Sequence, residues 1–111
     1  NDDRVYTPAD LLPVCRDIGL PLVYDVHHHR CLPDGSGVDE TTTAALATWD
    51  REPLFHVSSP RDAGRSIREH ADYIRPCDIP ASWISLDITV DIEAKAKEMA
   101  VIRLMRDLGR V

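Results

Sequence analysis

The sequence contains few cysteines and no long apolar segment. Cys15, Cys31 and Cys77 are odd in number and widely spaced, which argues against a disulfide framework or a C-x-x-C metal pair. No apolar run approaches the ~20 residues of a membrane-spanning helix. Residues 1–4 also lack the basic and apolar regions of a signal peptide. We therefore expect a cytoplasmic protein with reduced thiols and no membrane partner.

Basic charge is also scarce. The chain has 13 Lys and Arg against 19 Asp and Glu, a formal net charge of −6. This balance argues against a broad nucleic-acid-binding surface. A local basic stretch around Arg61 and Arg65 remains, and bound divalent cations would offset clustered carboxylates. At 111 residues and 43% hydrophobic content, residues 1–111 fit one small globular domain.

The first third of the chain predicts a helix followed by a strand. Thr7 suits the N-cap position, Pro8 the first helical position and Gly19 the C-terminal stop, so we expect a helix over 7–19. The apolar run 20–26 lacks strict alternation and predicts a strand buried on both faces, as in a parallel sheet.

The remaining elements continue this alternation. We expect a helix over 39–49, strands over 54–58 and 87–92, and a helix over 94–108, with 76–83 irregular and 67–73 open between a helical turn and a short strand. The order predicts an α/β fold built from βαβ units around a parallel sheet. Right-handed crossovers bring the ends of successive strands to one edge, where α/β folds place their sites.

Polar side chains occur at these strand ends. Asp25 and a run of three histidines follow the first strand, His56 lies in the second, His70 follows it through a loop, and Glu93 follows the third. Three imidazoles and two carboxylates on one edge would form a divalent-metal site. Mixed nitrogen and oxygen ligands suit Mn²⁺, Zn²⁺ or Fe²⁺ better than Ca²⁺.

Each of these residues also has a simpler interpretation. His56 alone could be a hydrogen-bonded core histidine, and Glu93 alone could favour the positive N-terminus of the last helix. Their joint placement favours the metal interpretation. The choice within the histidine run stays open, because an extended strand puts Asp25, His27 and His29 on one face and so favours His27.

Five segments together resemble the UV damage endonuclease family: 6–12, 24–28, 55–59, 70–74 and 93–98. The resemblance extends along essentially the whole chain. It implies a partial TIM barrel, about the last three βα units of a (β/α)₈ barrel related to the endonuclease IV class. Residues 1–111 would then be the C-terminal portion of a metal-dependent endonuclease barrel.

The resemblance also implies a ligand set. The family spacing Asp-x-x-His points to Asp25 and His28, and three later residues match further ligand positions: His56, His70 and Glu93. His27 and His29 then become supporting residues beside the ligands. The implied cofactor is a cluster of divalent ions, Mn²⁺ in the first place, with Zn²⁺, Mg²⁺ and Co²⁺ as alternatives.

The implied activity is DNA repair, by incision of damaged double-stranded DNA on the 5′ side of a UV-damaged nucleotide. Arg61 and Arg65 are candidates for contacts to DNA phosphates. Leu54 departs from the family, since some members carry a lysine there, and any role of that lysine is in doubt here.

Two alternatives to this activity remain. One is another metal-dependent barrel, such as a sugar isomerase of the xylose isomerase type. The other follows from the family's upstream ligands, a glutamate directly before the segment that matches 1–3 and further histidines, which this chain does not contain. The isolated chain would then be inactive and would self-associate through exposed sheet edges.

Overall fold

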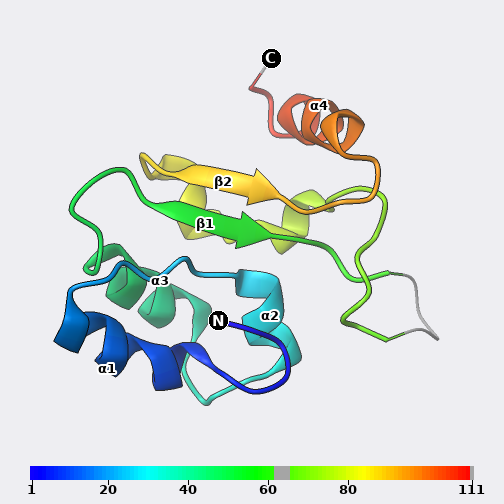
Figure 1. The fold of residues 1–111 in the computed structure, drawn as a ribbon. Coiled ribbons are helices and arrows are strands. Elements are labelled where there is room, and N and C mark those ends of the chain that lie inside the picture. Colours follow the sequence, from blue (N-terminus) through cyan, green and yellow to red (C-terminus); the bar gives the residue numbers. More distant parts are fainter. Residues whose placement is uncertain (62–65, 111) are drawn as a thin grey trace.

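A computed structural model describes residues 1–61 and 66–110. Its centre is a parallel sheet of two strands, β1 (Leu54–Val57) and β2 (Thr89–Ile92), paired from Leu54↔Thr89 to Val57↔Ile92. Figure 1 shows α1 (Pro8–Ile18) and α3 (Val38–Leu46) on one side of these strands and α4 (Glu98–Asp107) on the other. The chain therefore has the α/β architecture with parallel strands that the sequence predicts.

The first predicted helix is confirmed, and the hydrogen bonds at its ends explain why it forms there. The Thr7 side chain accepts a hydrogen bond from the Asp10 backbone N–H, and the Asp10 carboxylate accepts one from the Thr7 backbone N–H at 3.0 Å. This reciprocal cap satisfies two N–H groups that an uncapped helix leaves without partners. Gly19 ends the helix in the left-handed conformation at φ 71°.

The predicted strand over 20–26 is wrong in extent. Only Asp25 makes a bridge, parallel to His56 of β1, and the chain then enters helix α2 (Val26–Cys31). The Asp25 side chain caps that helix by accepting from the His28 backbone N–H at 2.9 Å. The histidine run is therefore helical rather than extended, and the alternation argument for His27 does not apply.

Two other segments also differ from the expectation. Residues 67–73 form turns with an antiparallel bridge between Pro60 and His70. The segment expected to be irregular forms two short 3₁₀ helices, η1 (Pro76–Asp78) and η2 (Ala81–Ser85). Helix α4 begins four residues later than predicted. The chain before it pairs its backbone with the loop at Ala71, through a hydrogen bond from the Lys95 N–H at 3.1 Å.

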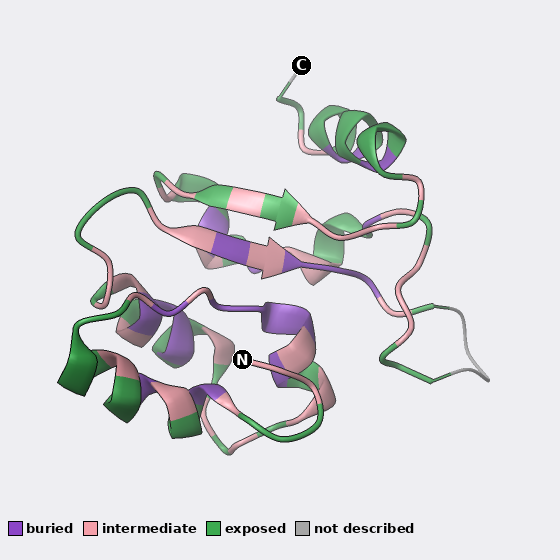
Figure 2. Ribbon diagram, in the orientation of Figure 1, coloured by how far each residue is buried: buried purple, intermediate pink, exposed green. Residues whose placement is uncertain are grey.

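The core lies between the sheet and helices α1 and α3, where Figure 2 shows the buried segments of both. Tyr24, Phe55 and Trp83 form its aromatic centre, with ring centroids 5.1 to 6.0 Å apart. Val57 and the side chain of Phe55 are fully buried, which holds β1 rigidly in place. In the part of the chain that the structure describes, no helix combines the length and apolar character that crossing a membrane requires.

Lys97, the N-cap of α4, has a strained backbone. Its φ of 53° and ψ of −123° suit glycine, and such strain costs a non-glycine residue of the order of 1–3 kcal/mol. We expect Lys97→Gly to stabilise the protein by about 1 kcal/mol after the larger entropy of glycine in the unfolded chain is counted. Denaturant unfolding measures this. Lys97→Ala removes the same charge but keeps the strain, so equal stabilisation by both variants would contradict the explanation.

Candidate metal centre

Asp25 lies at the point where the sheet meets helix α2. Its side chain is 3% exposed, and its Oδ1 is occupied by the cap of that helix. Its Oδ2 is buried without a hydrogen-bond partner, 3.3 Å from His28 Nδ1 and 3.9 Å from His56 Nδ1. A buried carboxylate oxygen without a partner is costly, so this atom needs a cationic or hydrogen-bonding neighbour.

His28 shares the first turn of α2 with this cap. Its Nδ1 lies 3.0 Å from the backbone carbonyl oxygen of Asn1, which can only accept. Nδ1 therefore carries the proton, and Nε2 is the atom available as a ligand. The side-chain amide of Asn1 also bonds both the backbone N–H and the carbonyl of Asp25, each at 3.0 Å.

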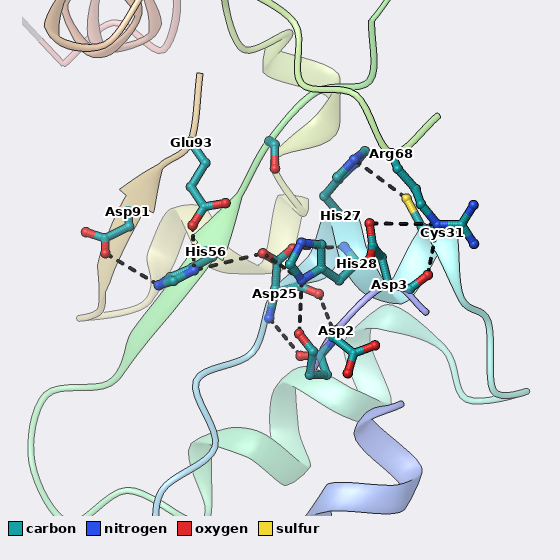
Figure 3. Close-up of polar contacts among 12 residues, drawn as sticks. Asp2, Asp3, Asp25, His27, His28, Cys31, His56, Arg68, Asp91 and Glu93 are labelled. Atoms are coloured by element: carbon teal, nitrogen blue, oxygen red, sulfur yellow. Dashed lines mark hydrogen bonds and ion pairs between the residues drawn. The ribbon is translucent and has the colours of Figure 1, made fainter. Parts of the chain in front are cut away.

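His56 and Glu93 come from the two neighbouring strands. His56 Nδ1 lies 2.9 Å from Glu93 Oε1, and Glu93 follows directly on β2, where its backbone N–H donates to Val57 O. Figure 3 shows His56 between Asp25 on one side and Glu93 and Asp91 on the other. The parallel register brings these side chains to one edge of the sheet.

His70 reaches the same place from the loop after β1. The antiparallel bridge to Pro60 and the hydrogen bond from the Ala71 N–H to Ser59 O, at 2.8 Å, fold that loop back over the strand end. His70 Nε2 lies 3.5 Å from the Ser58 hydroxyl. A residue 14 positions after His56 in sequence is thereby brought beside Glu93.

The five side chains expected to bind metal therefore converge. They form two groups, His28 with His70 and Glu93, and Asp25 with His56 and Glu93, and in each group the ligand atoms lie within 4.8 Å of one another. Glu93 belongs to both groups. Two or more adjacent cations could be held here by imidazole nitrogens and carboxylate oxygens, a donor set that suits borderline divalent ions.

His27 and His29 occupy different positions from the ligand groups. His27 is 2% exposed, its ring centroid lies 5.5 Å from that of His70, and its Nε2 lies 3.6 Å from Cys31 Sγ. Burial lowers the pKa of His27, and the nearby Asp25 carboxylate only partly opposes this. A neutral His27 can pack against His70 without adding positive charge beside a cation site.

His29 links Tyr24, in the segment before α2, to Asp34 in the loop after α2. Its Nδ1 lies 2.5 Å from the Tyr24 hydroxyl and its Nε2 lies 2.8 Å from Asp34 Oδ1. Burial raises the pKa of Tyr24 well above its usual value, so its hydroxyl stays protonated and donates. Partial burial alone would raise the pKa of Asp34, but hydrogen bonds from Ser36 N, His29 and Ala9 N hold it below its usual range.

We expect Asp34→Asn to destabilise the protein by about 1–3 kcal/mol at neutral pH, because the neutral amide keeps only one of the two acceptor oxygens that His29, the Ser36 N–H and the Ala9 N–H share, and the remaining hydrogen bonds lose their charge assistance. The folded pKa of Asp34 is lowered, so its stabilising contribution is present above the unfolded pKa of about 3.9 and is lost as pH falls through the folded pKa. The stability gap between the two proteins should therefore shrink below about pH 4. Urea titrations across pH measure it, with Asp17→Asn on the exposed face of α1 as the control. A gap that stays constant down to pH 2 would contradict this assignment.

Of the two arginines predicted to contact DNA, the structure describes only Arg61. Arg61 donates its backbone N–H to Glu69 O at 2.9 Å, and its guanidinium lies 3.9 Å from the Glu69 carboxylate. Arg65 lies outside the described residues. A contact from either to DNA stays a prediction.

Two further residues beside the cluster were not among the predicted site residues. Asp91 is the register partner of His56, and its Oδ2 lies 3.4 Å from His56 Nε2. The available signal was its position two residues before Glu93, on the same face of a strand. Arg68 lines an open groove of about 530 Å³ together with His70, Glu93 and Lys95.

The fold and this cluster define a class: parallel α/β proteins that gather histidine and carboxylate side chains at the carboxyl ends of their strands. The family model for UV-endonuclease UvdE matches residues 1–111, and the chain belongs to that family. The resemblance found in the sequence is thereby confirmed.

Individual relatives agree with this assignment. The UV DNA damage endonuclease of Bacillus velezensis (strain DSM 23117 / BGSC 10A6 / LMG 26770 / FZB42) is 37% identical over 121 residues, which cover 100% of this chain and 37% of that protein. That of Halalkalibacterium halodurans (strain ATCC BAA-125 / DSM 18197 / FERM 7344 / JCM 9153 / C-125) is 36% identical, over 98% of this chain and 36% of its own length. The chain thus spans little more than a third of these relatives.

A solved structure gives the same result for the fold. The crystal structure of SacUVDE superposes on the whole chain with a TM-score of 0.85, at 23% sequence identity and over 39% of its own length. The chain is therefore a partial TIM barrel, as the family resemblance implied.

Proposed function

We propose that the protein containing these residues is a DNA-repair endonuclease that hydrolyses the phosphodiester on the 5′ side of UV-damaged nucleotides with bound divalent ions. The observation that carries this proposal is the pair of ligand groups that share Glu93. Membership of the UV-endonuclease family and relatives named UV DNA damage endonuclease support hydrolysis of DNA rather than isomerisation of a sugar.

The residues of the cluster fit a divalent cation. The buried Asp25 Oδ2 has no hydrogen-bond partner, and a cation beside it would supply the missing partner. His56 Nδ1 and Glu93 Oε1 face the same space. We propose Mn²⁺ as the native ion, with Zn²⁺, Mg²⁺ and Co²⁺ as substitutes, because imidazole and carboxylate donors occur together.

Bound divalent ions supply Lewis-acid stabilisation of the charge on an attacked phosphate and activate water as its nucleophile. The side chains of the cluster would hold the ions and orient the phosphate and the water. Glu93 joins the two ligand groups, and the ring of the buried His27, whose pKa is lowered, packs against that of His70. Arg68 and Lys95 line the groove next to His70 and Glu93, where their positive charges suit a DNA phosphate.

The proposal is tested by nicking of UV-irradiated supercoiled plasmid by the intact protein after removal of metal. We expect incision to require an added divalent ion, highest with Mn²⁺, and an end-labelled duplex with one photoproduct to be cut on its 5′ side. Unirradiated plasmid is the control. Equal nicking of both plasmids, or full activity in excess chelator, would contradict the proposal.

We make a separate prediction about the association and activity of the isolated 111-residue chain. Within residues 1–61 and 66–110, β2 pairs only with β1, so its second edge is free to pair with another chain. The chain covers only 37% of a full relative's length. We expect the isolated chain to self-associate and to lack incision activity, as light scattering and plasmid nicking will show. A monomeric, fully active fragment would contradict this.

A further inference from the structure

The side chain of Asn1 takes the place of a neighbouring strand beside Asp25. The bridge between Asp25 and His56 joins this segment to β1, with the His56 N–H donating to Tyr24 O at 2.9 Å. In a parallel ladder the backbone groups of successive residues point to opposite edges, so the N–H and carbonyl of Asp25 itself point away from β1. The carboxamide of Asn1 meets both of them there, each at 3.0 Å.

This pairing matches the chemistry of a peptide group. A carboxamide offers an N–H donor and a carbonyl acceptor, which are the two groups that a neighbouring strand would present. Asn1 Oδ1 accepts from the Asp25 N–H, and Asn1 Nδ2 donates to Asp25 O, which also accepts from the His29 N–H at 3.1 Å. A carbonyl oxygen has two lone pairs, so it can accept both bonds. The backbone at Asp25 is thereby held at both edges of its segment.

The backbone of Asn1 contacts a second residue of the cluster. Its carbonyl oxygen lies 3.0 Å from His28 Nδ1, and Figure 3 shows His28 next to Asp25. Asp25 and His28 belong to different ligand groups, which share Glu93. Asn1 therefore touches one member of each group, through its side chain in one case and its backbone in the other.

We infer that Asn1 is a positioning residue whose side chain fixes the backbone of Asp25 and so aims Asp25 Oδ2 into its ligand group. Asp25 Oδ1 is already occupied by the His28 N–H at 2.9 Å, so the direction of Oδ2 follows from where the backbone is held. This inference rests on the proposed metal site and adds a neutral residue that acts through Asp25. Loss of groups that hold metal ligands in place lowers metal affinity about 10- to 100-fold.

The first experiment needs no metal. Amide hydrogen exchange of the intact, metal-free protein, followed by ¹⁵N–¹H NMR, reports how firmly each backbone N–H is held. Asn1→Leu keeps a similar shape, adds no charge and removes both bonds to Asp25. We expect the Asp25 amide to exchange about tenfold faster in this variant, relative to the His56 amide on the other edge. A merely structural role would accelerate both amides alike, and this result, or an unchanged Asp25 amide, would overturn the inference.

The second experiment measures Mn²⁺ affinity by calorimetry. We expect a loss of about 10- to 100-fold in Asn1→Leu. The matched control is Thr48→Val, because Thr48 Oγ1 accepts from the Leu22 N–H at 2.8 Å and so holds the same segment through a side chain, away from the cluster. This control should lower the urea midpoint and change Mn²⁺ affinity less than about twofold. Equal losses of affinity in the two variants would assign the effect to general loosening of the segment and overturn the inference.

Failure to fold and failure of the proposed function are separable from these results. If Asn1→Leu does not fold, Asn1→Ala takes its place. It removes the same two bonds without added bulk, and a water that replaced the carboxamide would still let the Asp25 amide exchange. A wild type that binds no Mn²⁺ would contradict the proposed function. A wild type that binds Mn²⁺ no more tightly than a folded Asn1→Leu protein would overturn the role of Asn1 alone.

Discussion

Glu93→Gln is expected to reduce metal-dependent incision of irradiated DNA by about three orders of magnitude. Glu93 is the residue shared by both ligand groups, so its loss weakens each of them. Electrostatic stabilisation by bound cations contributes several kcal/mol to such a reaction, and each 1.4 kcal/mol is a factor of ten in rate. Plasmid nicking at saturating Mn²⁺ measures the rate, and calorimetry measures the accompanying loss of metal affinity.

The matched control is Glu40→Gln, the same change on an exposed residue in the first turn of α3. It should leave the incision rate and metal affinity within twofold of the wild type. Circular dichroism and the urea midpoint establish that both variants fold. Retention of wild-type incision by a folded Glu93→Gln protein would remove the basis of the two-group site.

Phe55→Ala is expected to destabilise the protein by about 3–5 kcal/mol, the usual cost of emptying a buried aromatic site. Phe55 is 0% exposed and lies 5.1 Å from Trp83 and 5.9 Å from Tyr24, measured between ring centroids. The free energy of unfolding of a domain is of the order of 5–15 kcal/mol, so this loss is a large fraction of its stability. Denaturant unfolding of the intact protein measures it.

Tyr6→Ala is the control for this change, because Tyr6 is an aromatic residue with 56% exposure. It should change the free energy of unfolding by less than about 0.5 kcal/mol. A Phe55→Ala cost below about 1 kcal/mol would show that the aromatic cluster does not form the core in solution.

Local patterns were enough to predict much of this fold. Thr7, Pro8 and Gly19 predicted a helix whose two ends the structure confirms within a residue, because caps act over a few neighbouring positions. The alternation of helices and strands predicted the parallel sheet. The placement of His56 and Glu93 at strand ends followed from the same order, since parallel strands bring their carboxyl ends to one edge.

The histidine run shows where periodicity fails. Alternation assumed that the strand continued past Asp25, which favoured His27. The Asp25 side chain instead caps α2, and a helix brings residues three apart to one side, so His28 joins the cluster and His27 is buried. The resemblance to the UV damage endonuclease family pointed to His28, whereas the residues alone left the choice open.

The sequence by itself determined the first helix with its cap, the two strands of the parallel sheet and the set of histidines and carboxylates that could bind metal, because these depend on neighbours along the chain. Only the tertiary structure decided that Glu93 would belong to two ligand groups and that Asp91 would lie beside His56. Both results depend on the pairing register of β1 with β2 and on the loop that returns His70. That register is set by packing between segments more than thirty residues apart, which no local pattern contains.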